Sequence, residues 1–317
     1  MAYYETTYTT ATPALDIMIN LQTWMPANGY VFVETYTSGT NITDVYKSPG
    51  TSNSFGTDFY IGFNRTTTTT TSVSVMIFEQ YNVSTHLATK YAPSTGNTTM
   101  TPASDGSVND SGVLLSSTTS GASLYKGTAI YAPVTTAITH YININVNRII
   151  WGNSTSYSDS GYAGLYDPIG NSSLFPLIVL NIGYNSYNST TLPTYTIFKS
   201  GALTRESYIT AATSNWAAYS GYSTSQFVFF IGNDGIPAGT NPKTGFTYSS
   251  LLTFTSVKQP TYQRQLGTLK DFIFNPQGGA NLNGGDTLSI TVGANTYNYV
   301  KPATYVSYVS YVWIPKQ

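Results

Sequence analysis

Short runs of β-branched and aromatic residues, separated by turn residues, recur along this chain and favour a fold made of many strands. The clearest runs cover residues 30–36, 58–63, 72–78, 141–149, 227–231 and 286–292. Val, Ile, Thr, Tyr and Phe suit the pleated surface of a sheet, whereas Gly, Pro, Asn and Asp suit the turns between strands. We therefore expect a mainly β fold, with antiparallel sandwich or barrel-like layers and an N-terminal amphipathic helix.

The helix is predicted from residue 13 to residue 25. Thr12 can act as the N-cap, and Pro13 suits the first helical position, where its missing N–H is not needed. The apolar residues that follow repeat at helical spacing, namely Ile17, Met18, Leu21, Trp24 and Met25. Pro26 and Gly29 end the segment. Residues 206–218 are compatible with a second helix.

Two strand segments carry more specific patterns. Residues 141–149 alternate apolar and polar side chains, which predicts a strand with one buried and one exposed face. Residues 286–292 and 296–300 flank a Gly-Ala-Asn turn sequence, so we expect them to form a hairpin. Residues 305–314 are the last candidate strand, which Pro315 ends.

The segment 92–121 differs in composition from its surroundings, because it is poor in large apolar residues and rich in Ser, Thr, Gly and Asn. It fits a long loop, an exposed insertion or a connection between domains. We therefore expect a helix plus β region over residues 1–91, a polar loop or insertion over 92–121, and the main β domain over 122–317.

Charged residues make up 9% of the chain, against about 25% in an ordinary soluble domain. The 13 basic and 14 acidic residues nearly cancel, so neither nucleic acid binding nor strong repulsion between copies is expected. Cysteine is absent, which excludes disulfides and thiolate metal sites. The sequence shows no secretion signal at its start and no apolar run of about 18 residues, so we expect no membrane span.

Few residues offer the chemistry of catalysis. His86 and His140 are the only imidazoles and lie far apart in the sequence, which is a weak basis for a metal site. Glu34, Asp58 and Glu79 lie in or beside predicted strands and are the carboxylates to inspect for an acid pair. The sequence has neither a Gly-x-Ser-x-Gly elbow nor a phosphate-binding glycine motif. We therefore expect no enzyme activity, no cofactor and no metal.

Aromatic residues make up 15% of the chain, and 28 of them are Tyr. Tyr-rich surfaces with little charge bind through aromatic packing and adaptable hydrogen bonds, as subunit interfaces do. We expect Trp24 in the core. The candidates for contact with partners are Trp151, Trp216, Trp313, Tyr305, Tyr308 and Tyr311. The same rings could instead stack on the sugars of a host receptor or glycan.

Four sequence segments carry a resemblance to a known family: residues 1–9 (MAYYETTYT), the helix segment 13–25, residues 56–63 (GTDFYIGF) and the hairpin segment 284–297. In these segments the chain resembles virion structural proteins of tailed bacteriophages, especially small tail, tail-tip or baseplate-associated proteins. The resemblance implies β-rich domains that assemble in the host cytoplasm, in many copies, into a virion. Its partners would be other virion proteins and copies of itself.

Several alternatives stay open at this point. Within a virus particle, a capsid decoration or minor capsid role is the nearest one, and binding to a host receptor or glycan can accompany a tail role. The low charge and the high Thr and Tyr content also fit a protein of an archaeal virus or of a surface layer.

Overall fold

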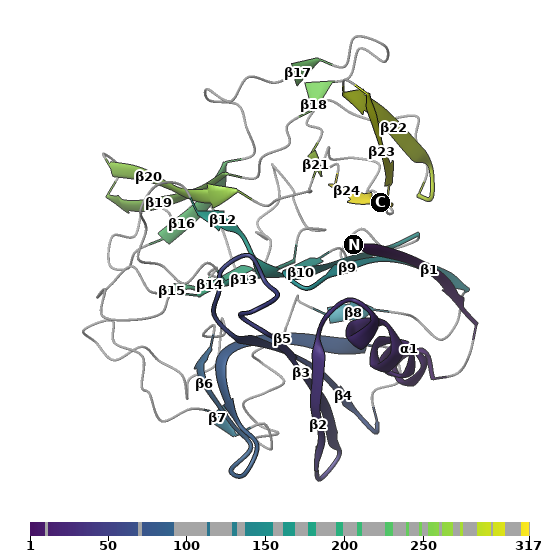
Figure 1. Cartoon of the computed structure of the whole chain (residues 1–317), viewed down its shortest axis with the longest axis vertical. Helices are drawn as coiled ribbons and strands as arrows, with labels where there is room; N and C mark the ends of the chain where they lie inside the picture. The colour runs from purple at the N-terminus through teal and green to yellow at the C-terminus, as the bar shows by residue number, and fades with distance from the viewer. Residues whose placement is uncertain are drawn as a thin grey trace.

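The computed structural model is mainly β, with one helix in the part of the chain that it describes (Figure 1). That part covers residues 1–9, 12–68, 72–91, 113–114, 129–131, 137–154, 161–168, 177–181, 195–198, 208–210, 226–230, 239–240, 247–248, 253–259, 262–268, 273–274, 284–292, 294–301 and 312–316. Every strand pairing within these residues is antiparallel. The predicted fold class and the predicted N-terminal helix are both confirmed.

The helix α1 (Pro13–Ala27) follows the predicted pattern closely. Thr12 takes the N-cap position, although its side chain makes no capping hydrogen bond, and its backbone oxygen accepts from Leu15 and Asp16. The helix runs two residues past the predicted end, because Pro26 fits within its last turn. Its buried side is made of Pro13, Ala14, Ile17, Met18, Leu21 and Met25.

A curled sheet packs against α1. Its strand order is β2 (Val31–Ser38), β3 (Asn41–Ser48), β4 (Phe59–Thr66), β5 (Ser72–Asn82), β6 (Leu87–Tyr91) and β7 (Val113–Leu114), with β8 (Ala129–Tyr131) beside β5. Tyr46, Phe63 and Val75 are fully buried and join the apolar side of α1 in one core. Of the polar segment 92–121, the structure describes β7, which pairs with β6.

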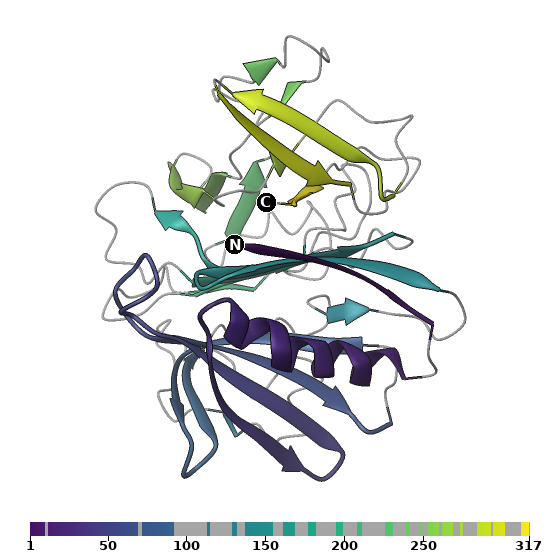
Figure 2. The same cartoon turned by 45° about the vertical axis from the view of Figure 1, so that its right-hand side comes forward.

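A second sheet crosses the middle of the molecule (Figures 1 and 2). Its order is β1 (Ala2–Tyr8), β9 (Ile138–Asn145), β10 (Arg148–Asn153), β11 (Gly161–Leu165), β13 (Leu177–Asn181), β14 (Tyr195–Phe198) and β15 (Tyr208–Thr210). Because β1 pairs with β9, the first residues of the expected region 1–91 share a sheet with the expected region 122–317.

Two sequence predictions are wrong in this central sheet. Residues 141–149 form two strands joined by a tight turn at Val146 and Asn147, and both faces of β9 are largely buried. Residues 208–210, which lie inside the second predicted helix, form β15 instead. The aromatic and β-branched side chains of Tyr208, Ile209 and Thr210 favour a strand over a helix.

The remaining strands form smaller sheets above the central one. One contains β12 (Asp167–Pro168), β20 (Tyr262–Thr268), β19 (Thr253–Gln259) and β16 (Gln226–Phe230), and a pair is formed by β17 (Gly239–Thr240) and β18 (Thr247–Tyr248). The last contains β21 (Ile273–Phe274), β24 (Val312–Pro315), β23 (Asn295–Val300) and β22 (Thr287–Val292). The predicted hairpin is confirmed, since β22 and β23 pair from Thr287 and Val300 to Val292 and Asn295.

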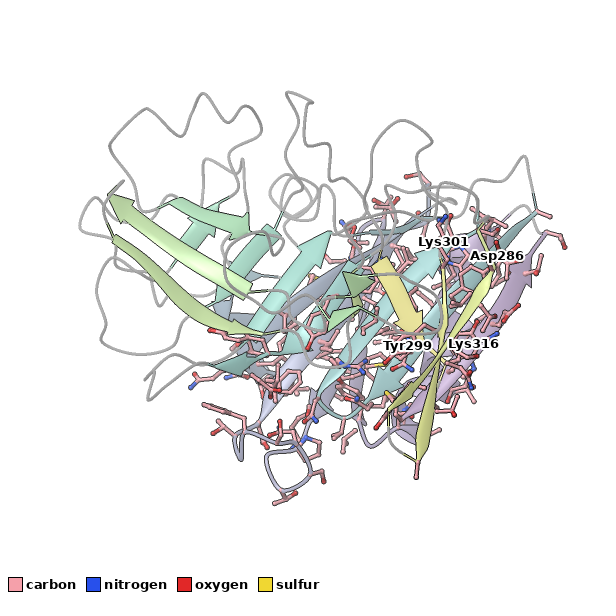
Figure 3. The ribbon with its side chains drawn as sticks, turned by 90° about the horizontal axis from the view of Figure 1, so that it is seen from above. Asp286, Tyr299, Lys301 and Lys316 are labelled. Carbon is pink, nitrogen blue, oxygen red and sulfur yellow. The ribbon has the colours of Figure 1, made fainter. Side chains whose placement is uncertain are left out.

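The edge strand β1 contacts a different layer with each of its faces. On one face, Tyr4 stacks on Trp24 of α1, with ring centroids 4.4 Å apart. On the other face, Lys316 lies 3.8 Å from Glu5 and over the ring of Tyr3. Figure 3 shows Lys316 beside the C-terminal strands, near Tyr299 of β23 and near Lys301, which follows that strand. The first strand therefore links α1 to the end of the chain.

Candidate interaction surface

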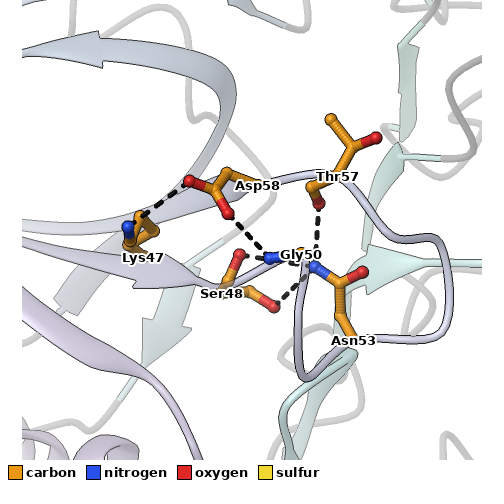
Figure 4. A network of polar contacts seen from close by, with 6 residues as sticks. All are labelled: Lys47, Ser48, Gly50, Asn53, Thr57 and Asp58. Carbon is orange, nitrogen blue, oxygen red and sulfur yellow. Dashed lines mark hydrogen bonds and ion pairs between the residues drawn. The ribbon is translucent and has the colours of Figure 1, made fainter.

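Asp58, one of the three carboxylates singled out in the sequence, stabilises the loop between β3 and β4. One of its oxygens lies 3.3 Å from Lys47 Nζ, and the other accepts a hydrogen bond of 2.7 Å from the backbone N–H of Gly50. Asn53 fixes the same loop through hydrogen bonds to Ser48 and to the backbone oxygen of Thr57 (Figure 4). These contacts assign Asp58 a structural role.

Glu34, the second of these carboxylates, connects strands that are not neighbours. Its Oε1 accepts a hydrogen bond of 2.5 Å from the hydroxyl of Tyr81 and lies 3.0 Å from Nδ1 of His86. Glu34 is on β2, Tyr81 is on β5, and His86 is in the turn that follows β5. We call these three residues the clasp. The side chain of Glu79, the third carboxylate, lies outside the described residues.

The clasp joins the edge strand β2 to β5, which lies three strands away in the curled sheet. Glu34 is opposite Val45, Val45 is opposite Gly62, and Gly62 is opposite Met76, so the four residues share one face. Strands lie about 4.8 Å apart, which would separate β2 from β5 by roughly 14 Å in a flat sheet. A direct hydrogen bond between Glu34 and Tyr81 therefore requires the curvature that Figure 1 shows.

His86 is held in an unusual backbone conformation. Its φ is +54°, and it is the one non-glycine residue with a positive φ in the described part of the chain. Its ring stacks on Tyr36, with centroids 3.9 Å apart, and its side chain is 31% exposed. The contacts to Tyr36 and Glu34 offset the cost of this conformation.

His140, the other histidine, has a different environment. It is 1% exposed, and its ring meets Tyr8 edge-on at 5.2 Å. Within the described residues, no group of three His, Cys, Asp or Glu side chains is arranged to hold a metal ion.

Asp44 is a buried carboxylate that the sequence analysis did not single out. It is 1% exposed and accepts hydrogen bonds from Gln22 of α1 at 3.0 Å and from Thr35 of β2 at 2.6 Å. Its neighbours in the sequence form an ordinary strand, so no local pattern marks it. Asp44, on β3, therefore joins α1 to the middle of β2.

The clasp yields a prediction for stability. Replacing Tyr81 with Phe removes one hydrogen bond to a carboxylate at a half-buried site, so the free energy of unfolding should fall by about 1–2 kcal/mol. Urea unfolding measures this change. The control is Tyr60→Phe, because Tyr60 packs against Tyr81 but its hydroxyl makes no hydrogen bond to a carboxylate within the described part of the chain. Equal losses in the two variants would show that the Glu34 hydrogen bond adds nothing.

Many of the described tyrosines face inward, and their ionisation is disfavoured. Burial raises the pKa of Tyr8 to about 12, while the hydrogen bond from Asn20 opposes this shift and the charge of Asp16 adds to it. Burial likewise raises the pKa of Tyr30 and Tyr46. In the unfolded chain these hydroxyls titrate near pH 10.

Alkaline pH should therefore destabilise the fold. The folded state keeps the protons of these tyrosines above pH 10, whereas the unfolded state loses them, so stability is fully present below about pH 10 and falls above it. Each such group contributes a slope of about 1.4 kcal/mol per pH unit. Urea unfolding between pH 7 and 11 checks this expectation. The Tyr8→Phe variant should show a smaller fall, and a constant free energy up to pH 11 would contradict the prediction.

The structure describes two of the six aromatic residues that were predicted to contact partners. Trp151 is 1% exposed and belongs to the core, so it is not a contact on the surface of the folded chain. Trp313 lies on β24 with its backbone paired to Ile273, and its side chain is outside the described residues. Trp216, Tyr305, Tyr308 and Tyr311 also lie outside them. Trp24, which was expected in the core, is half-buried and packs against the core from outside.

Four of the eight exposed large apolar side chains in the described part of the chain lie on α1 and β2. Leu15 and Ile19 of α1 are 37% and 51% exposed, and Val31 and Phe32 of β2 are 48% and 44% exposed. Residues 13–38 contain two charged side chains, Asp16 and Glu34, and no basic residue. Tyr297 is the one tyrosine with a comparably exposed side chain among the described residues. The exposed large apolar side chains on α1 and β2 are therefore Leu15, Ile19, Val31 and Phe32, and none of them is a tyrosine.

Among the described residues, no helix has both the length and the apolar character needed to cross a bilayer. No protein-family model matches the chain, and no curated protein matches it either.

Proposed function

We propose that this chain is a structural component of a virus particle, in the tail or baseplate, and that it assembles there with copies of itself and with other virion proteins. The observation that carries the proposal is the segment 13–38, which has two charged residues and exposes four large apolar side chains on α1 and β2. Exposed apolar groups on a surface with little charge are typical of subunit contacts.

The positions of the polar groups support an assembly role over catalysis. Glu34 and Asp58 are engaged by different partners, Tyr81 and His86 for the first and Lys47 and Gly50 for the second. Glu34 joins two side chains from other parts of the curled sheet, and Asp58 stabilises the loop between β3 and β4. We therefore expect neighbouring subunits to bind this chain through its exposed apolar side chains.

Mass spectrometry of purified virus particles tests the proposal. Particles from a culture that expresses the chain should contain it at a constant ratio to the major capsid protein through successive gradient purifications. Antibodies against the chain should label one end of the particle in electron micrographs. A chain that is lost during purification and remains monomeric at high concentration would contradict the proposal.

A further inference from the structure

The turn of the β5–β6 hairpin carries a histidine where the backbone favours glycine. Residues 83–86 connect Asn82 to Leu87, which are the last paired residues of the two strands. His86 ends this connection with a φ of +54°. Histidine tolerates the left-handed region, but glycine or asparagine adopts it more readily. The contacts of its ring distinguish His86 from the glycine or asparagine that the turn alone would favour.

The ring of His86 connects this hairpin to the β2–β3 hairpin, and both turn at the same end of the curled sheet (Figures 1 and 2). From β2, Tyr36 stacks on the ring with centroids 3.9 Å apart, and Glu34 Oε1 lies 3.0 Å from Nδ1 of His86. The side chains of His86 and Glu34 are 31% and 17% exposed, so water screens their contact in part. One imidazole thus holds two hairpins together.

The strength of this contact depends on one proton. Protonation places a proton on both ring nitrogens of His86, including the Nδ1 that faces Glu34, and adds the attraction between opposite charges. A neutral ring loses that attraction, and in one of its two tautomers Nδ1 has no proton to donate. The contact between the two hairpins is therefore stronger with the protonated ring.

The titratable groups that face His86 come from two strands in the described part of the chain. Glu34 and Tyr36 lie on β2, and Tyr81 donates to the same Glu34 oxygen from β5. Burial raises the pKa of Tyr81 and its hydrogen bond to Glu34 adds to this shift, so Tyr81 keeps its proton. Of the residue types in the clasp, histidine alone ordinarily changes charge between about pH 5 and 8. Two charged side chains of β5 and β6 lie outside the described residues, those of Glu79 and Lys90.

We propose that His86 is a pH-sensitive switch, which holds the β5–β6 turn against β2 when its ring is protonated and releases the turn when the ring is neutral. The hydrogen bond from Tyr81 to Glu34 persists in both states, so the change is confined to the turn and its hairpin. This switch belongs to the single chain and does not depend on the virion role.

Hydrogen exchange at two pH values tests the switch. After correction for the intrinsic effect of pH on exchange, the amides of residues 83–87 should be protected about threefold or more better at about pH 5.5 than at about pH 8, as expected for a partly exposed ion pair. Histidine labelling for NMR gives an independent readout, because the chain contains two histidines. The cross-relaxation between the rings of His86 and Tyr36 should weaken over the same pH interval.

Two variants remove the proton-dependent contact without removing the turn. His86→Asn keeps a residue that tolerates a positive φ, and Glu34→Gln keeps an oxygen that can accept from Tyr81. In both variants the protection of the turn should be the same at the two pH values. The matched control is Tyr81→Phe, which leaves the contact of His86 with Glu34 in place and should retain the pH difference. Circular dichroism checks that all three variants fold.

Each outcome decides for or against the switch. Equal protection of the turn at the two pH values in the wild type would overturn it. So would a pH difference that persists in His86→Asn, because another group would then be responsible. A difference that persists in Glu34→Gln would overturn the pairing with Glu34 on which the switch depends.

Discussion

Replacing Trp151 with alanine should lower the free energy of unfolding by about 3–5 kcal/mol, because a large side chain is removed from a packed core. Trp151 is 1% exposed and belongs to the same cluster as Ile142, Ile149 and Leu177. The residual cavity adds to the lost transfer free energy. Urea unfolding of the variant measures the loss, and a change below about 1 kcal/mol would contradict a core role.

The partner of Trp151 makes this prediction more specific. Gly161 lies directly opposite it on β11, and a Cβ added at Gly161 would come within 2.0 Å of the Trp151 ring. Gly161→Ala alone should therefore be strongly destabilising, by about 1–3 kcal/mol or more. Combining it with Trp151→Phe, which shortens the ring system, should cost less than the sum of the two single changes. Strict additivity in this double-mutant cycle would show that the two residues do not touch.

Replacing Asn143 with Leu should lower the free energy of unfolding by about 2–4 kcal/mol, because it leaves buried polar groups without partners. Asn143 is fully buried, and its Oδ1 accepts a hydrogen bond of 2.9 Å from Nη1 of Arg148, which is also buried. Its Nδ2 donates a hydrogen bond of 2.8 Å to the backbone oxygen of Pro315. The side chain thus joins β9 and β10 to the C-terminal strand.

The control for this change is Thr23→Leu, a polar-to-apolar substitution on the exposed side of α1. It should alter the free energy of unfolding by no more than about 0.5 kcal/mol. Hydrogen exchange gives an independent readout. Amides of β24 should exchange faster in Asn143→Leu than in the wild type, and unchanged exchange there would contradict the connecting role of Asn143.

Local patterns in the sequence predicted the elements that depend on neighbouring residues. Pro13 and the spacing of Ile17, Met18 and Leu21 were sufficient for α1, because a helix buries one side of a continuous segment. The hairpin of β22 and β23 was predictable for the same reason, since a short turn brings adjacent segments together.

Contacts between distant segments account for the errors. The polar alternation at 141–149 predicted that Asn143 faces solvent, yet Pro315 covers that face from 172 residues away in the sequence. The sequence analysis placed Trp151 at the surface because the residues that bury it, such as Gly161, are brought there by strand pairing, which the local sequence does not show. The clasp joins residues 47 and 52 positions apart and forms only because the sheet curls.

Hydrogen–deuterium exchange of the chain, alone at low concentration and within the native assembly, tests the central claim most directly. That claim is that the charge-poor exterior of α1 and β2 is covered by other subunits. Peptides that cover residues 13–38 should exchange more slowly in the assembly, with the amides of β2 protected about tenfold or more. Equal exchange of this segment in the two states, with protection confined to other parts of the chain, would contradict it.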